Sequence, residues 1–236
     1  TTARGAADDP FDLRWFGSVA SGVLIDRWTA LRRAAGCASG VHSRQVHGTA
    51  MAWHDDDRPG LWIGEGLDGH GTQTPGILLT ISVADCVPVS VVHEERRAVA
   101  LLHAGWRGTA AGILAAGIDM LVRTAAVEPG SLHVHLGPSI CGDCYEVGPE
   151  VHEALGLPAP PARATVDLGA VLIRQARSLG VREGRITRSA YCTRCGDSPF
   201  FSHRGGSAAR QLGILGLVGR SVMRRSGIPP GRNAVS

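Results

Sequence analysis

Short apolar runs alternate with segments of helical periodicity along most of the chain. Four runs rich in Val, Ile and Leu are bounded by Gly, Pro or charged residues, a pattern typical of strands, and they span residues 76–83, 88–92, 98–103 and 132–136. After Thr109 and again after Asp167, apolar residues recur every three or four positions, which predicts two helices, the first with Thr109 as its N-cap. Two further helices are predicted, one over residues 25–36 and one from Pro149 onward. This order of strands and helices predicts an α/β or α+β fold in which a mixed β-sheet is layered with helices.

The length of the chain limits the number of domains. With 236 residues, 44% of them hydrophobic, the chain can close one sizeable core. We therefore expect a single domain with its core over residues 41–219, an N-terminal segment (1–40) of the same domain, and a basic C-terminal tail over 220–236. The Pro-rich stretch 156–164 is long enough to turn a corner but too short to separate domains.

The charge of the chain narrows the classes of partner. The formal net charge is +3, and the arginines are scattered rather than gathered in one stripe, which favours small anionic ligands over nucleic acid. No apolar stretch approaches the roughly 20 residues that span a bilayer, and the first ten residues lack a signal-peptide hydrophobic region. We therefore expect a cytoplasmic protein that does not bind membranes. In that reducing compartment the six cysteines are expected to be thiols, metal ligands or nucleophiles; three disulfides are the alternative for a secreted protein.

A histidine stands at the carboxyl end of the strand predicted over residues 98–103. The sequence "GWRGT" follows His103 after Ala104 and leads into the next predicted helix. Unpaired N–H groups at a helix start, two glycines that let the backbone approach a ligand (Gly105 and Gly108) and the planar guanidinium of Arg107 together form a candidate anion site, suited to phosphate. The alternative is structural: Arg107 pairs with a carboxylate, and His103 is an ordinary hydrogen-bonded core histidine.

Two other segments offer metal-binding or nucleophilic groups. His47 lies near the end of "SRQVHG", and Cys86 follows the predicted strand 76–83 in "SVADCVP". One thiolate and two neutral imidazoles, those of His47 and His103, are ligands that Zn²⁺ takes in an open catalytic site. The same three groups could instead form a metal-free pair in which a histidine activates a cysteine nucleophile. Spacing alone does not distinguish these two readings.

The chain also holds two CxxC pairs, Cys141 with Cys144 and Cys192 with Cys195. About fifty residues separate the pairs, whereas four-cysteine zinc motifs usually separate them by about 15–20. We expect reduced packing thiols, with a second structural zinc or a redox pair as alternatives. His133 and His135 alternate with apolar residues and are expected to lie on a solvated strand face.

Six motifs, in order along the chain, resemble those of the laccase-domain proteins: "SRQVHG", "ADCVPV", "LHAGWRGTAAGI", "GPSICGDCYEVGPEV", "CTRC" and "FFSHRG". That family was once called multicopper polyphenol oxidases and is now described as purine nucleoside phosphorylase with accompanying adenosine deaminase activity. The resemblance covers roughly residues 40–215, and "HAGWRG" with "ADC" upstream is its most specific part.

The resemblance implies a catalytic metal centre. His47, Cys86 and His103 match the residues that bind zinc and form the catalytic centre of the family, in a fold similar to the catalytic domain of cytotoxic necrotising factor toxins. Arg107 matches the arginine of the family's "HAGWRG", where the local pattern predicts an anion.

Two residues beside these motifs are assigned roles by their adjacency in sequence. We expect Gln45 to contact a substrate amide. We expect Asp85 to orient a metal ligand without binding the metal itself. The chain also departs from the family pattern: residues 1–40 diverge from the usual opening of the family, His203 stands where a tyrosine is more usual, and Val83 replaces a common threonine. These departures concern the substrate pocket more than the metal centre.

The function implied is that of a zinc-dependent purine nucleoside phosphorylase. It would cleave adenosine or inosine with phosphate to give the base and ribose 1-phosphate, with adenosine deaminase as a side activity. A copper-dependent polyphenol oxidase is one alternative, but its histidine-rich copper motifs are missing, since the chain has a single HxH. A hydrolase that edits cell-wall precursors is a further alternative, and so is a non-catalytic zinc-binding regulatory protein. The sequence predicts no oligomeric state.

Overall fold

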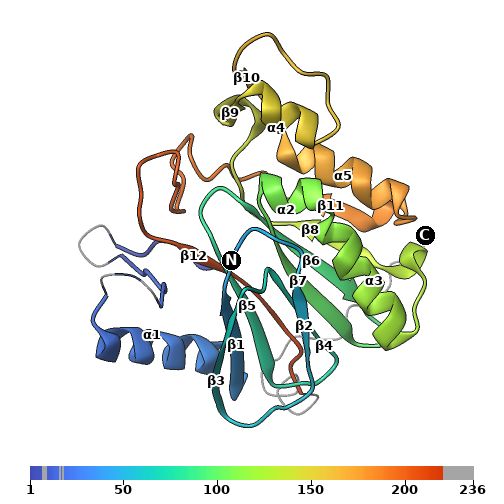
Figure 1. Ribbon diagram of the computed structural model, residues 1–236. Helices are drawn as coiled ribbons and strands as arrows, with labels where there is room; N and C mark the ends of the chain where they lie inside the picture. Colours follow the sequence, from blue (N-terminus) through green and yellow to red (C-terminus); the bar gives the residue numbers. More distant parts are fainter. Residues whose placement is uncertain (7–9, 16, 18, 220–236) are drawn as a thin grey trace, which may run out of the picture.

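Two mixed β-sheets form the centre of the protein, which is described here by a computed structural model over residues 1–6, 10–15, 17 and 19–219 (Figure 1). The smaller sheet contains, in spatial order, β12 (Gln211–Gly216), β5 (Ile77–Val83), β1 (Ser39–Arg44) and β3 (Gly60–Glu65). The larger sheet contains β11 (Ile186–Arg188), β8 (His133–Leu136), β6 (Val87–His93), β7 (Ala98–Ala104), β4 (Gly69–Thr72) and β2 (Met51–His54). Both sheets mix parallel and antiparallel neighbours.

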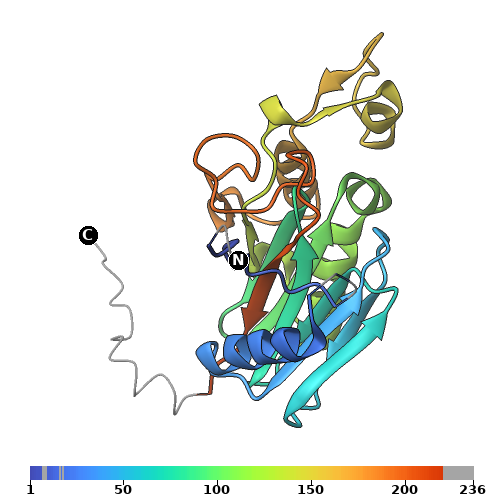
Figure 2. The same ribbon diagram turned by 90° about the vertical axis from the view of Figure 1, so that its left-hand side faces the viewer.

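Helices cover the outer faces of both sheets. The helix α1 (Ser21–Ala34) buries Leu24 and Trp28 against Leu212 of the smaller sheet. On the far side, α2 (Trp106–Ala111), α3 (Ile113–Ala125) and α5 (Leu168–Ser178) cover the larger sheet (Figures 1 and 2). The protein is therefore built of four layers: helix, sheet, sheet and helices. Within the described residues, no helix is both long and apolar enough to serve as a membrane span.

A small projection extends beyond these layers. It consists of β9 (Glu146–Val147), α4 (Pro149–Ala154) and β10 (Ala164–Thr165), and it stands away from the sheets at the top of both views (Figures 1 and 2). Short 3₁₀ turns, η1 (Pro129–Ser131), η2 (Gly142–Cys144) and η3 (Glu183–Arg185), complete the described elements.

The two faces of β7 bury side chains in different cores. Val99 and Leu101 pack against β5 between the two sheets, whereas Ala100 and Leu102 face the helices. Side chains alternate along a strand, so His103 lies on the face of Val99 and Leu101, as the sequence predicts. The polar end of this inter-sheet face is therefore the place where a site can form.

The mixed α/β fold is confirmed, and the four predicted strands each lie within one residue of their expected bounds. The strands divide into two packed sheets rather than one. The predicted N-cap at Thr109 is wrong: α2 starts at Trp106 with Gly105 as its N-cap, and the Thr109 N–H donates inside the helix to the carbonyl of Gly105 (2.8 Å). The predicted tail, 220–236, lies outside the described residues.

Four strands between residues 39 and 72 were not predicted. The strand β4 reads Gly-His-Gly-Thr and is wholly buried, so its polar residues give no apolar pattern. His70 lies in it with no exposed surface and bonds the His54 ring (Nδ1 to Nε2, 3.0 Å). The hydrogen-bond partners of such buried polar residues lie in distant parts of the sequence, so hydrophobic periodicity does not reveal the strand.

Candidate metal centre and its cavity

Three segments bring His47, Cys86 and His103 together at one end of the sheets. His47 follows β1, Cys86 lies between β5 and β6, and His103 is the penultimate residue of β7. Their ligand atoms all lie within 4.8 Å of one another. The two imidazole rings meet edge to face, with centroids 4.7 Å apart. The sequence-predicted cluster therefore forms in the structure.

Asp68 is the residue that assembles this cluster, and the sequence analysis missed it. The carboxylate is fully buried and accepts a hydrogen bond from His103 Nδ1 at 2.8 Å. It also accepts the backbone N–H groups of Val46 (3.1 Å), His47 (2.9 Å) and Gly48 (2.7 Å). Because a carboxylate only accepts, His103 must carry its proton on Nδ1, which leaves Nε2 free for the cluster.

The loop that carries His47 wraps around this carboxylate. His47 has a φ of 61°, in the left-handed region that a residue with a side chain seldom occupies. Three successive backbone donors turned toward Asp68 hold this conformation. The buried Asp68 carboxylate therefore maintains the strained backbone of His47, and this backbone conformation directs the His47 ring toward Cys86.

The electrostatics of the cluster favour an ionised thiol. Burial alone would raise the pKa of Cys86, but the positive charge of His103 and hydrogen bonds from His103 and His47 outweigh it and lower the pKa from 9.0 to about 6. Burial would likewise lower the pKa of His103, but the Cys86 thiolate and Asp68 raise it from 6.5 to about 9. Without a metal, the pair is a thiolate beside an imidazolium.

The donor set fits a tetrahedral metal ion. One thiolate and two imidazole nitrogens are ligands that Zn²⁺ prefers, and the spread of their ligand atoms allows one ion to reach all three. Three protein ligands leave a fourth coordination place, which is the arrangement of a catalytic rather than a structural site. These residues can therefore hold a metal ion.

The two predicted glycines serve close packing of protein segments. A Cβ at Gly105 would lie 2.9 Å from both Cys86 Sγ and His47 Cδ2, so only glycine lets α2 begin against the cluster. A Cβ at Gly108 would lie 3.1 Å from the carbonyl oxygen of Gly48. Gly105 lines the cavity described below, whereas Gly108 is buried outside its lining. The structure places Gly108 against another loop, not against the space where an anion would bind.

Asp85 and Gln45 make contacts that differ from those expected. The Asp85 carboxylate accepts the Thr193 hydroxyl (2.7 Å) and the Arg204 backbone N–H (2.7 Å), so it ties two later loops to the segment of Cys86. The Gln45 side chain exchanges two hydrogen bonds with the backbone of Ser82, at 2.7 and 3.0 Å. Both residues line the cavity, and their predicted roles toward ligand and substrate stay predictions.

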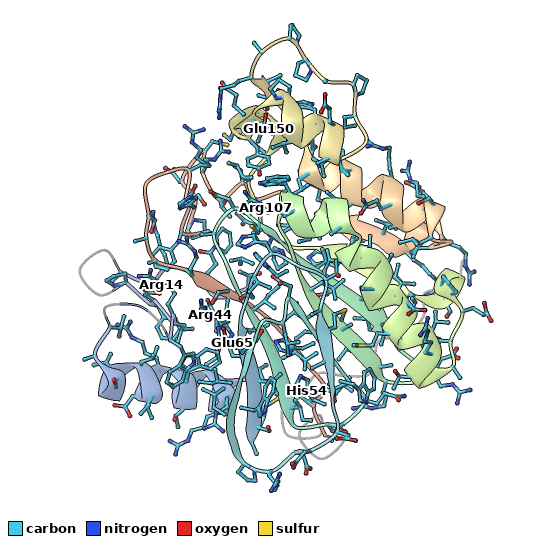
Figure 3. The ribbon with its side chains drawn as sticks, in the orientation of Figure 1. Arg14, Arg44, His54, Glu65, Arg107 and Glu150 are labelled. Carbon is cyan, nitrogen blue, oxygen red and sulfur yellow. The ribbon has the colours of Figure 1, made fainter. Side chains whose placement is uncertain are left out.

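A cavity of about 540 Å³ opens over the cluster. Its volume suits a small molecule. Its walls are rich in positive charge, because five arginines line it together with a single carboxylate, that of Asp85; these are Arg14, Arg44, Arg107, Arg204 and Arg210. Figure 3 shows Arg107 at the start of α2, with Arg14 and Arg44 on the side toward α1. His203 also lines the cavity.

Arg107 differs from Arg14 and Arg44 in how it is held, and it resembles Arg204, which lies over the ring of Tyr145 at 4.9 Å. Arg14 is paired with Asp12 at 2.7 Å and Arg44 with Glu65 at 3.2 Å. The Arg107 guanidinium lies over the ring of Trp106, 4.3 Å from its centroid, and in the described part of the chain it forms no ion pair. The alternative in which Arg107 serves a structural carboxylate therefore finds no partner among these residues.

The remaining predicted groups lie away from this cavity. His133 and His135 alternate with the buried Val134 and Leu136 and point outward, as expected for a solvated strand face. The four cysteines of the CxxC pairs gather in a second cluster despite their separation in sequence.

Comparison with known proteins places the chain in a family. Residues 23–218 match the family model described as multi-copper polyphenol oxidoreductase laccase. The chain belongs to this laccase-like family. The laccase-like resemblance seen in the motifs is thereby confirmed.

Relatives of this laccase-like chain carry enzyme names. It is 36% identical over 191 residues to adenosine deaminase RL5 from an unidentified prokaryote, covering 74% of this chain and 70% of that protein. It is 33% identical over 201 residues to a purine nucleoside phosphorylase of Deinococcus radiodurans, covering 80% and 76%. The crystal structure of YlmD from Geobacillus stearothermophilus is similar with a TM-score of 0.81 at 28% identity, covering 89% of this chain and 86% of that one.

Proposed function

We propose that the protein is a zinc-dependent purine nucleoside phosphorylase with an adenosine deaminase side activity. The observation that carries the proposal is one cavity in which the His47, Cys86 and His103 cluster lies beside an arginine-rich wall. Relatives named for both activities support it. A metal site supplies hydrolytic chemistry, and unpaired positive charge favours an anionic second substrate.

His47, Cys86 and His103 would hold the zinc ion, and Asp68 would keep His103 in the tautomer that binds it. Bound there, zinc would act as a Lewis acid and lower the pKa of water. The raised pKa of His103 in the metal-free cluster means that metal binding competes with a proton at this ring.

Phosphorolysis requires the cavity to hold two substrates in line. Hydrogen phosphate attacks the anomeric carbon of the ribose, the bond from that carbon to the purine nitrogen breaks, and the proton of the phosphate ends on the departing base. The Arg107 guanidinium offers a planar pair of donors for two phosphate oxygens and is always charged. Arg107 would bind the phosphate and offset its repulsion from the Cys86 thiolate and the Asp85 carboxylate.

Deamination uses water in place of phosphate. Water adds at C6 of adenosine, ammonia leaves, and inosine is formed. This reaction needs no anion, so it depends on the metal cluster and not on the arginine wall. The two activities therefore make different demands on Arg107.

The test is product analysis after the pure protein is incubated with adenosine, with and without phosphate. We expect adenine and ribose 1-phosphate only when phosphate is present, and inosine with ammonia under both conditions. A Cys86→Ser variant with an unchanged circular dichroism spectrum serves as the control for contaminating enzymes. If neither product forms while oxygen is consumed with a phenol in copper-loaded protein, the polyphenol oxidase alternative is correct instead.

A further inference from the structure

The two CxxC pairs meet because two neighbouring strands run in the same direction. The strands β8 and β11 are parallel, so the loops that follow them leave the same edge of the sheet. The loop after β8 carries Cys141 and Cys144 at the η2 turn, and the loop after β11 carries Cys192 and Cys195. Ser139 and Cys192 form a parallel bridge between these loops. A separation of about fifty residues in sequence is thereby closed by sheet topology.

The four sulfur atoms have the spacing of a metal site. All four Sγ atoms lie within 4.8 Å of one another. Cys141 Sγ and Cys195 Sγ are 3.8 Å apart. A tetrahedral zinc ion with Zn–S bonds of about 2.3 Å sets neighbouring sulfurs about 3.8 Å apart. All four are free thiols, and none is paired in a disulfide.

Backbone donors around Cys192 fit a thiolate ligand. Its Sγ accepts the N–H groups of Cys141 and Arg194, both at 3.3 Å, and of Cys195 at 3.5 Å. Three donors directed at one sulfur favour the charged form, which is the form that binds metal. Thiols that merely filled a core would need no such donors.

We propose that Cys141, Cys144, Cys192 and Cys195 bind one structural zinc ion, separate from the ion proposed at the cavity. Four protein ligands close the coordination sphere, so this ion has no place for a substrate. Three of the cysteines are half-buried and Cys195 is exposed, at the surface where both loops turn.

The ion would fasten the loops that form one wall of the cavity. The segment between β8 and β9 supplies Ile140 and Tyr145 to the lining, and the later loop supplies His203 and Arg204. Thr193, next to Cys192, donates its hydroxyl to Asp85 beside the first cluster. A zinc ion at this position would hold both loops together, in addition to the packing of Cys144 and Cys192 against the main core.

The test counts zinc ions while removing one site at a time. Elemental analysis of dialysed wild-type protein should find about two zinc ions per chain, and a Cys192→Ser/Cys195→Ser double variant about one. Cys37→Ser, which removes a buried free thiol outside the cluster, is the matched control and should keep both. A His47→Ala variant should keep about one ion, which the double variant in that background then loses.

Two measurements that leave all four cysteines in place guard against misfolded variants. In the His47→Ala protein, a mercurial reagent that displaces zinc from thiolates should release about one zinc ion per chain to a metallochromic indicator. Cobalt-substituted His47→Ala protein should show the strong near-ultraviolet thiolate-to-cobalt absorption of a tetrahedral site.

Specific results would overturn the proposal. A non-reduced protein mass lowered by two or four hydrogens, with no thiol-bound zinc, would show disulfides in place of the site. Iron in place of zinc would refute the metal assignment, and zinc lost entirely from His47→Ala would refute the second site. If wild-type and His47→Ala instead hold the same single ion, the structural site stands and the proposed catalytic zinc fails.

Discussion

Replacing Asp68 by asparagine tests the residue that holds the candidate metal centre together. The change keeps the shape of the side chain but replaces one acceptor oxygen with a donating NH₂ group. In the native protein, Oδ1 accepts from the His47 N–H (2.9 Å) and His103 Nδ1 (2.8 Å), and Oδ2 accepts from Val46 (3.1 Å) and Gly48 (2.7 Å). Either orientation of the new amide sets its N–H groups against two donors.

The magnitude follows from which pair of donors is lost. With the amide nitrogen at the Oδ2 position, two backbone N–H groups lose their acceptor, at about 1–3 kcal/mol each. With the nitrogen at the Oδ1 position, His103 loses the partner that fixes its tautomer, and loss of such a partner typically weakens metal binding about 10- to 100-fold. In both orientations two donors lose their acceptor, and a neutral amide supports the basicity of His103 less than a carboxylate does. We therefore expect the free energy of unfolding to fall by about 2 kcal/mol or more and zinc affinity to fall at least about tenfold.

The assay is competition for zinc with a chromophoric chelator, together with urea unfolding of the metal-free protein. Asp119→Asn is the matched control, because Asp119 is an exposed carboxylate of α3 whose partner is Arg123 at 2.9 Å. It should change neither quantity beyond about 0.5 kcal/mol. A folded Asp68→Asn protein that binds zinc as tightly as the wild type would refute the role assigned to this carboxylate.

Four further predictions concern the cavity and the buried histidines. Cys86→Ser should lower turnover about 100-fold or more with the fold intact, and retention of a tenth of the activity would contradict it. Arg107→Lys keeps the charge but loses the planar fork, so the KM for phosphate should rise roughly 10- to 150-fold, with a smaller effect on deamination; parallel loss of both activities would make Arg107 structural. Gly105→Ala places a Cβ 2.9 Å from the Cys86 sulfur and should weaken metal binding by about 1–3 kcal/mol, whereas Gly22→Ala, which meets nothing within 4 Å, should not. Burial, followed by the charges of nearby histidines, lowers the pKa of His70 to about 3. Because the unfolded chain takes up this proton near pH 6.5 and the native one does not, His70 alone makes the free energy of unfolding fall by about 1.4 kcal/mol per pH unit below about pH 6. Burial also lowers the pKa of His42 to about 4 and adds to the wild-type slope, so urea unfolding should show that His70→Asn reduces the slope by about 1.4 kcal/mol per pH unit without abolishing it.

The sequence predicts those parts of the site that lie on apolar strands. The strands β5, β6 and β7 are rich in Val, Ile and Leu, and two of the three cluster residues stand at their ends, where side chains converge. His103 could therefore be placed on its face and at its strand end from periodicity alone. Its neighbours Cys86 and His47 were brought into the same group by their chemistry and by the family motifs.

Residues whose partners are distant in sequence could not be predicted in this way. Asp68 lies between glycines in "GLDGHGT", a polar stretch whose burial depends on strands formed by other parts of the chain. The cysteine pairs appeared too far apart because parallel pairing of β8 with β11 leaves no local pattern. The N-cap error has a local cause, since Gly105 can begin the helix without a capping side chain and Thr109 is buried within it.

The first cluster joins the two sheets to each other. His47 follows a strand of the smaller sheet, His103 lies in the larger one, and Cys86 stands on the chain that crosses between them. Asp68, which directly precedes β4 of the larger sheet, accepts hydrogen bonds from the loop that follows the smaller sheet's β1. An ion held there would cross-link the two sheets, so sliding of one sheet over the other would stretch its coordination bonds. With such an ion bound, the proposed chemistry and the mechanical cohesion of the protein would depend on the same point, and loss of the ion would weaken the interface between the sheets.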